Sequence, residues 1–170
     1  GIVKPLLLEG HAALSDFRRD ALLNNENVRA AGVEALTARF VYLLDMEAAA
    51  EPEVMRKVQA LLSAEREFEG DTGFFVTPRM GTISPWSSKA TDIFHNCGLK
   101  DVRRVERGIH YVLLDGKGRS FRLESCQAML PLLYDRMTEG VYCELDAMFK
   151  RMEPAPYREV DLLETGKQAL

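Results

Sequence analysis

The sequence predicts an α+β fold in which helices cover one face of an antiparallel sheet. Strand-like and helix-like segments alternate along the chain in short elements, as they do in compact layered domains. Two stretches, residues 6–46 and 74–114, each read strand, helix, strand, and each is followed by a further helical pattern. Such paired units indicate an internally duplicated, ferredoxin-like core. The length of 170 residues suits one domain with a short appendage.

The first half-unit opens with a short strand at residues 6–8. A helix follows, with Ser15 or His11 marking its start. Its apolar residues share one helical face: Leu14, Phe17, Ala21 and Val28. Residues 37–46 are rich in β-branched and aromatic residues and predict a buried strand. Pro52 then begins a second helix, at the first-turn position where proline is tolerated.

The second half-unit starts with a strand at residues 74–76, which Pro78 must end or move to an edge. The helix that follows extends to about Asn96, where Gly98 suits the left-handed position after a helix end. Three residues offer N-caps for this helix: Ser84, Ser87 and Ser88.

A long strand is expected over residues 102–115, with alternate apolar residues on one face. Residues 115–118 read as a hairpin turn into a strand at 120–123. Helical spacing returns over residues 129–136, although Pro131 must start or kink that helix. Residues 152–156 predict a linker. We therefore expect a domain over residues 1–150, with residues 151–170 forming the linker and the start of the next domain.

Composition narrows the class of protein. Lys and Arg total 22 against 26 Asp and Glu, a net charge of -4 that argues against a nucleic-acid partner. Three widely separated cysteines, with no CxxC pair, favour a reducing, cytoplasmic setting. No apolar run is long enough for a membrane span or a signal peptide. Because the chain starts with Gly and stops within a helical pattern, we expect a fragment of a longer protein.

Spacing supports no catalytic or metal site. Asp92, His95 and Cys97 are close in sequence, but on a helix Cys97 points away from His95, so it is expected to be a small buried core residue. The three histidines are scattered, and zinc-protease and nucleotide-loop patterns are absent. No catalytic residue, metal ligand or cofactor is therefore predicted within these residues.

The stretch TPRMGTISPWSSKATDIFHNCG, residues 77–98, differs from its surroundings in being polar, rigid and aromatic. Three interpretations remain open from the residues alone: helix capping with solvated cations, an anion site at the helix start, or a docking surface anchored by the only tryptophan. The docking and anion-binding interpretations use the same candidates: Arg79, Ser84, Trp86, Ser87, Ser88 and Lys89.

The same stretch, together with residues 105–108, resembles the N-terminal part of the large single-chain phosphoribosylformylglycinamidine (FGAM) synthases. Flanking segments agree in order: residues 14–18, 135–139 and 160–163. Met80 stands where the family has proline, and Pro131 interrupts a family helix. The resemblance covers essentially the whole chain.

The resemblance implies a non-catalytic domain that is similar to a fused dimer of the small PurS-type subunit. It would dock the synthase and glutaminase domains of the parent chain and support ammonia transfer between them. The parent enzyme would use ATP, magnesium and glutamine, and its catalytic cysteine would lie beyond these residues. The isolated fragment should be inactive and prone to self-association through its docking face. The alternative is a free-standing anion or sugar-phosphate module at the helix start near Ser87.

Overall fold

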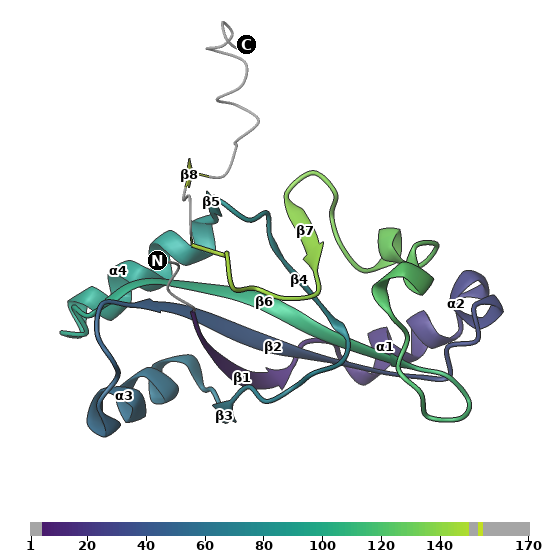
Figure 1. Cartoon of the computed structure of the whole chain (residues 1–170), viewed down its shortest axis with the longest axis horizontal. Coiled ribbons are helices and arrows are strands. Elements are labelled where there is room, and N and C mark those ends of the chain that lie inside the picture. The colour runs from purple at the N-terminus through teal and green to yellow at the C-terminus, as the bar shows by residue number, and fades with distance from the viewer. Residues whose placement is uncertain (1–4, 150–152, 155–170) are drawn as a thin grey trace, which may run out of the picture.

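The computed structural model describes residues 5–149, 153 and 154. Its main sheet has six strands in the order β3-β1-β2-β6-β4-β7, and all neighbours are antiparallel (Figure 1). The strands are β1 (Leu6–Ala12), β2 (Ala35–Met46), β3 (Arg66–Glu67), β4 (Phe74–Pro78), β6 (Val102–Leu114) and β7 (Glu139–Tyr142). A second, two-stranded sheet pairs β5 (Thr82–Ile83) in parallel with β8 (Glu153–Pro154). The α+β class is confirmed.

The centre of the sheet is the long β2–β6 pair, which stays in register from Ala35 opposite Leu114 to Asp45 opposite Arg104. β1 flanks β2 on one side as β4 flanks β6 on the other. Helices α1 (Asp16–Leu23) and α2 (Glu26–Ala30) connect β1 to β2 at one end, and α4 (Pro85–Asn96) connects β4 to β6 at the other (Figure 1). This matched arrangement is what a duplicated unit produces, and it agrees with the ferredoxin-like prediction.

Helices cover one face of the sheet, and the alternation of side chains along β2 shows which residues they cover. Its even-numbered apolar residues form two core clusters. Leu36 and Ala38 lie in the cluster that also contains Val28 of α2. Tyr42 and Leu44 pack with α3 (Pro52–Leu62) and α4. Helices α1 and α2 therefore lie over one end of this face, and helices α3 and α4 lie over the other end.

The opposite face carries the odd-numbered residues Val41 and Leu43, and it is covered by a non-helical segment of the chain. The segment after β7 crosses this face and buries Leu145 and Met148 against Phe75. The chain therefore reaches β8 after passing over the side of the sheet away from the helices.

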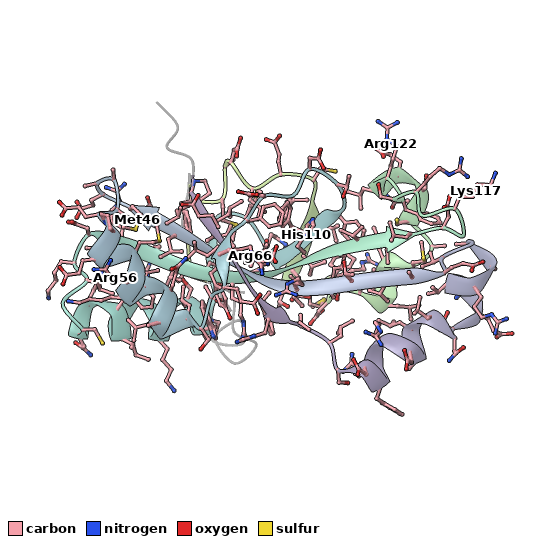
Figure 2. The ribbon with its side chains drawn as sticks, turned by 90° about the horizontal axis from the view of Figure 1, so that it is seen from below. Met46, Arg56, Arg66, His110, Lys117 and Arg122 are labelled. Atoms are coloured by element: carbon pink, nitrogen blue, oxygen red, sulfur yellow. The ribbon has the colours of Figure 1, made fainter. Side chains whose placement is uncertain are left out.

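A mixed polar and aromatic cluster lies on this second face. Arg39 bridges Glu65 at 2.6 Å and Glu9 at 3.2 Å. His110 donates from Nε2 to the carbonyl oxygen of Thr72 at 2.7 Å, and burial lowers the pKa of its imidazole. In Figure 2, Arg66 and His110 both lie near the middle of the molecule.

The first predicted helix is divided in the structure, and its predicted face is only partly correct: Leu14 and Val28 pack in the core, whereas Phe17 and Ala21 are exposed. Ser15 caps α1, as expected, but a second cap at Asn25 starts α2. The register set by these caps turns Phe17 outward, where 81% of its surface is exposed, and Leu22 and Leu23 pack against the core instead. The other main predicted elements hold: α3 begins at Pro52, β4 ends at Pro78 and α4 ends at Asn96.

The region after β6 also differs from expectation. The predicted strand at 120–123 is a single bridge between Leu114 and Ser120. Residues 129–136 form no α-helix; the chain makes short 3₁₀ turns, η1 (Leu123–Cys126) and η2 (Leu130–Leu132). Pro131 supplies no N–H to continue a helix. The pattern also missed β7. The predicted linker and next domain lie outside the described residues, except for β8.

Candidate interaction surface at the start of helix α4

The turn between β4 and β5 is held by Arg79. Its Nη2 donates to the carbonyl oxygen of Arg136 at 2.7 Å, and its main-chain N–H donates to that of Thr138 at 3.1 Å. Gly81 completes the turn at a φ of 87°, a conformation that favours glycine. Arg79 is exposed, yet its head group holds the loop that precedes β7.

Met80 uses a hydrogen bond that the expected proline could not make. Its main-chain N–H donates to the hydroxyl oxygen of Tyr142 at 2.9 Å. Its side chain packs against the cluster on the helix-free face. The substitution from the family pattern is therefore accommodated by a specific contact in this chain.

The start of α4 is capped by Ser84. The Ser84 hydroxyl accepts from the N–H of Ser87 at 3.0 Å, and Pro85 occupies the first turn. Ser84 Oγ also lies 2.9 Å from both carboxylate oxygens of Glu106. Since Ser84 Oγ already accepts from Ser87, its proton must point to Glu106.

Glu106 is almost fully buried, with 1% of its surface exposed. Burial raises the pKa of its carboxyl group, and hydrogen bonds from the main-chain N–H of Arg107 and from Ser84 oppose that change. The Glu106 carboxylate lies beside Ser84, the N-cap residue of α4, so its charge opposes the binding of an external anion at this helix start. The chain thus supplies its own acid at the position predicted as an anion site.

A row of polar side chains one helical turn apart fixes α4 against the edge of β6. Ser87 Oγ donates to the carbonyl oxygen of Val105 at 2.6 Å, and Thr91 Oγ1 accepts from the N–H of Val105 at 3.2 Å. His95 Nε2 donates to the carbonyl oxygen of Val102 at 2.7 Å. Residues at this spacing share one helix face. His95 therefore helps to attach α4 to β6.

Trp86 is half-buried and packs against the core of this domain. Its ring stacks on Tyr42, with centroids 6.2 Å apart. On the same face, the guanidinium carbon of Arg107 lies 5.0 Å from the Trp86 ring centroid and 4.7 Å from that of Phe40. Arg107 is thus held between two aromatic rings, an arrangement that restricts its head group to one plane.

These residues border a hollow of about 220 Å³, which we call the Trp86 hollow. Its lining residues come from β2, β4, β6 and β7 and from the start of α4. Its lining consists of Phe40, Val76, Pro78, Ser84, Pro85, Trp86, Glu106, Arg107, Gly108, Ile109 and Glu139. Among the described residues, the Arg107 guanidinium has ring contacts but no hydrogen-bond or ion-pair partner.

The six predicted site residues are only partly brought together. Ser84 and Trp86 line the hollow, whereas Ser87 is fully buried and Arg79 is directed to the loop before β7. Ser88 and Lys89 are exposed on the first turns of α4.

Sequence reasoning missed Phe40, Glu106 and Arg107, which come from the two central strands. Glu106 and Arg107 carried no distinct signal, because this part of β6 also contains the charged residues Arg103 and Arg104.

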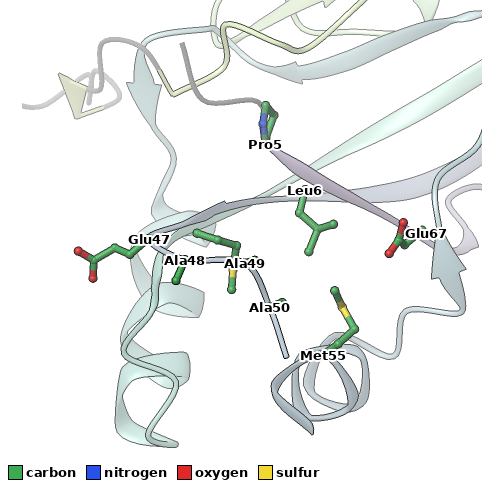
Figure 3. A pocket seen from close by; sticks show the side chains of 9 residues that line it. Pro5, Leu6, Glu47, Ala48, Ala49, Ala50, Met55 and Glu67 are labelled. Carbon is green, nitrogen blue, oxygen red and sulfur yellow. The ribbon is translucent and has the colours of Figure 1, made fainter. Parts of the chain in front are cut away.

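The described part of the chain offers little support for a site of another kind. No group of three metal-binding side chains is present there. Cys97, expected to be buried, is exposed at the end of α4, and Cys126 is the buried thiol. None of the described helices has the length and apolar character needed to cross a bilayer. A larger hollow of about 520 Å³ opens beside α3 and is walled by Leu6, Met46 and Met55 (Figure 3).

Comparison with known protein families identifies a match over most of the chain. The family model described as formylglycinamide ribonucleotide amidotransferase N-terminal matches residues 39–150. The matched range begins within β2 and contains α3, α4 and all the residues that line the Trp86 hollow.

Proposed function

Because the chain belongs to the family of formylglycinamide ribonucleotide amidotransferase N-terminal domains, we propose that it serves as the docking domain of an FGAM synthase. The family places it in purine biosynthesis, as a non-catalytic part of that enzyme. In this proposal it holds the synthase and glutaminase domains of the same chain in register. Ammonia released by one domain then reaches the activated substrate in the other without escaping to water.

The parent enzyme, in this proposal, is a cytoplasmic ligase. It converts formylglycinamide ribonucleotide to formylglycinamidine ribonucleotide with ATP and glutamine. ATP and magnesium are bound by domains outside this chain. The 170-residue chain alone is expected to hydrolyse neither glutamine nor ATP, and glutaminase activity in a pure sample would contradict the proposal.

The observation that carries the docking role is the fixed orientation of Trp86. Its ring packs on Tyr42 and Arg107, which are neighbours on β2 and β6, while Pro85, Ser88 and Lys89 beside it are exposed. A rigid aromatic residue loses little conformational entropy on binding, which is why tryptophan is enriched at interface hot spots. The polar residues around it supply the rim that such interfaces have.

The test is Trp86→Ala in the full-length enzyme. Loss of the anchor should let glutamine hydrolysis continue while less of the ammonia appears in product, so the ratio of glutamate formed to product formed rises. Phe17→Ala, at an aromatic residue that is 81% exposed on the far end of the molecule, is the matched control. An unchanged ratio, with the variant folded by thermal unfolding, would refute the docking role of Trp86.

The alternative, an anion or sugar-phosphate module at the start of α4, has weaker support. The buried Glu106 carboxylate already lies at this helix start, and Ser87 directs its hydroxyl to Val105. An additional anion would meet like charge there. Calorimetric titration of the isolated chain with ribose 5-phosphate discriminates the two: micromolar binding would favour the module.

Self-association of the isolated chain is a further part of the proposal. Within residues 5–149, five large apolar side chains are exposed: Phe17, Leu61, Ile93, Leu132 and Met137. Exposed apolar side chains of this size favour contact between copies of the chain at high concentration. A monomer at millimolar concentration in analytical ultracentrifugation would weaken this expectation.

A further inference from the structure

The Trp86 hollow is bordered by two opposite charges that do not pair with each other. Arg107 of β6 and Glu139 of β7 both line it. β4 lies between these two strands (Figure 1), so their main chains are about 10 Å apart. No ion pair joins these two described residues. The hollow therefore offers a positive and a negative group to the same ligand.

Strand register places both charged side chains on one face of the sheet. Ile109 is opposite Val76, and Val76 is opposite Val141 on its other side. Arg107 lies two residues before Ile109 on β6, and residues at this spacing point to the same face. Glu139 has the same relation to Val141 on β7. The two charges therefore project from the same face, one on each side of β4.

Each charged group is held in place by contacts of its own. The guanidinium carbon of Arg107 lies 4.7 Å from the ring centroid of Phe40 and 5.0 Å from that of Trp86. Oε1 of Glu139 accepts from the main-chain N–H of Asp135 at 2.8 Å. A guanidinium has five N–H donors and a carboxylate has two oxygens, so both groups keep hydrogen-bonding capacity for a ligand. Groups that are already fixed lose little conformational entropy on binding.

We propose that the Trp86 hollow binds a small aliphatic α-amino acid in its zwitterionic form. The ligand carboxylate accepts two parallel hydrogen bonds from Arg107, and the ligand ammonium group donates to Glu139. Its aliphatic side chain packs on Val76 and Ile109, which also line the hollow. The hollow has a volume of about 220 Å³, below the roughly 300–1,000 Å³ of sites for drug-sized molecules. The ligand is therefore small.

The charges of the lining select a zwitterion over simpler ions. Glu106 is a second carboxyl group in the lining, so an anion without a positive group would meet two carboxyl groups and one guanidinium. A simple amine would leave Arg107 without a hydrogen-bond acceptor from the ligand. The ligand needs both charges on a short frame, as an α-amino acid has. This inference goes beyond the docking role of Trp86, which is tested separately in the full-length enzyme.

The only tryptophan of the chain is in contact with Arg107, so its fluorescence responds to binding. Titration of the 170-residue protein with L-valine should give a saturable change in the millimolar range, and calorimetry measures the same equilibrium. Isovalerate is L-valine without the ammonium group, and isobutylamine is L-valine without the carboxylate. Each should bind at least ~10-fold more weakly, because the hydrogen bonds of one charged group are lost.

Glu139→Gln tests the negative side of the site without removing the contact with Asp135. The glutamine side-chain oxygen can still accept from the main-chain N–H of Asp135, so stability in urea denaturation should be kept. The affinity for L-valine should fall roughly 10-fold. Glu124→Gln removes an exposed carboxylate outside the lining and should leave the affinity unchanged.

Three results would each overturn the proposal. The first is the absence of a saturable response to L-valine in both fluorescence and calorimetry. The second is binding of isovalerate or isobutylamine as tight as that of L-valine, since one charge would then suffice. The third is an affinity of Glu139→Gln for L-valine equal to that of the wild type.

Discussion

The hydroxyl of Ser87 donates to the main-chain carbonyl oxygen of Val105 at 2.6 Å, and it joins a helix to the edge of a strand. β4 pairs with β6 only from Ile109 to Tyr111, so the main chain of β6 before that point has no strand neighbour on this side. Ser87 and Thr91 satisfy the C=O and the N–H of Val105 in its place. A helix therefore completes the hydrogen bonding of the sheet edge.

Ser87→Ala should destabilise the fold by about 1–3 kcal/mol, because a buried carbonyl group loses its donor. Ser88 is the next residue and is exposed, so Ser88→Ala should change the free energy of unfolding by less than about 0.5 kcal/mol. Urea denaturation of both variants measures the difference. Equal effects would mean that the Val105 carbonyl finds another partner.

Glu106→Gln should change how stability depends on pH. The pKa of Glu106 is raised above its ordinary value of 4.5 in the folded state, chiefly by burial. The contribution of Glu106 to the free energy of unfolding is therefore fully present below pH 4.5 and is lost as the pH rises through the folded-state pKa. Relative to the wild type, the Gln variant should become more stable as pH increases from 4 to 8. Parallel curves in urea denaturation across that range would contradict the assignment.

His110→Gln should act in the opposite direction. The pKa of His110 is lowered from its ordinary value of 6.5, chiefly by burial beside Phe68 and Phe75. Its contribution to stability is present above 6.5 and is lost as pH falls through the lower folded-state pKa. The variant, which keeps a donor for Thr72, should lose less stability than the wild type on acidification. His11→Gln removes an exposed imidazole and is the control; an NMR titration of His110 gives an independent measurement.

Gly108→Ala should weaken the contact between β6 and β4. A Cβ at this position would lie 2.6 Å from Thr77 Cγ2 and 2.9 Å from the carbonyl oxygen of Val76. Overpacking of this kind costs about 1–3 kcal/mol. At Gly116 the nearest atoms belong to the flexible side chain of Glu34, at 3.3 Å or more, so Gly116→Ala is the matched control. Thermal unfolding compares the two variants, and a similar melting temperature would show that β4 can shift.

The elements that sequence predicted well are those with strong local signals. Pro52 and Pro85 each occupy the first turn of a helix, and Ser84 precedes the second of these prolines. Long apolar alternation marked β2 and β6. These features depend on residues within one or two turns of each other, which a single sequence contains.

The failures have physical causes of two kinds. Residues 129–136 have helical spacing, but Pro131 has no main-chain N–H to donate within a helix. The Asp135 carboxylate also accepts a hydrogen bond from the main-chain N–H of Met137, which stabilises a tight turn. The contact of Arg107 with Trp86 depends instead on how α4 lies over β6. No local pattern contains that information, so the candidate surface was located only at its Trp86 end and its strand residues were missed.

The β2–β6 ladder also governs how the chain reaches this structure. Its paired residues are separated by roughly 55 to 80 positions along the chain, and such non-local pairing slows folding because a large loop must close before the contacts form. Until β6 arrives, β2 presents a long apolar edge with nothing beside it on that side. The central pair of the sheet can therefore be completed only after synthesis has passed Leu114.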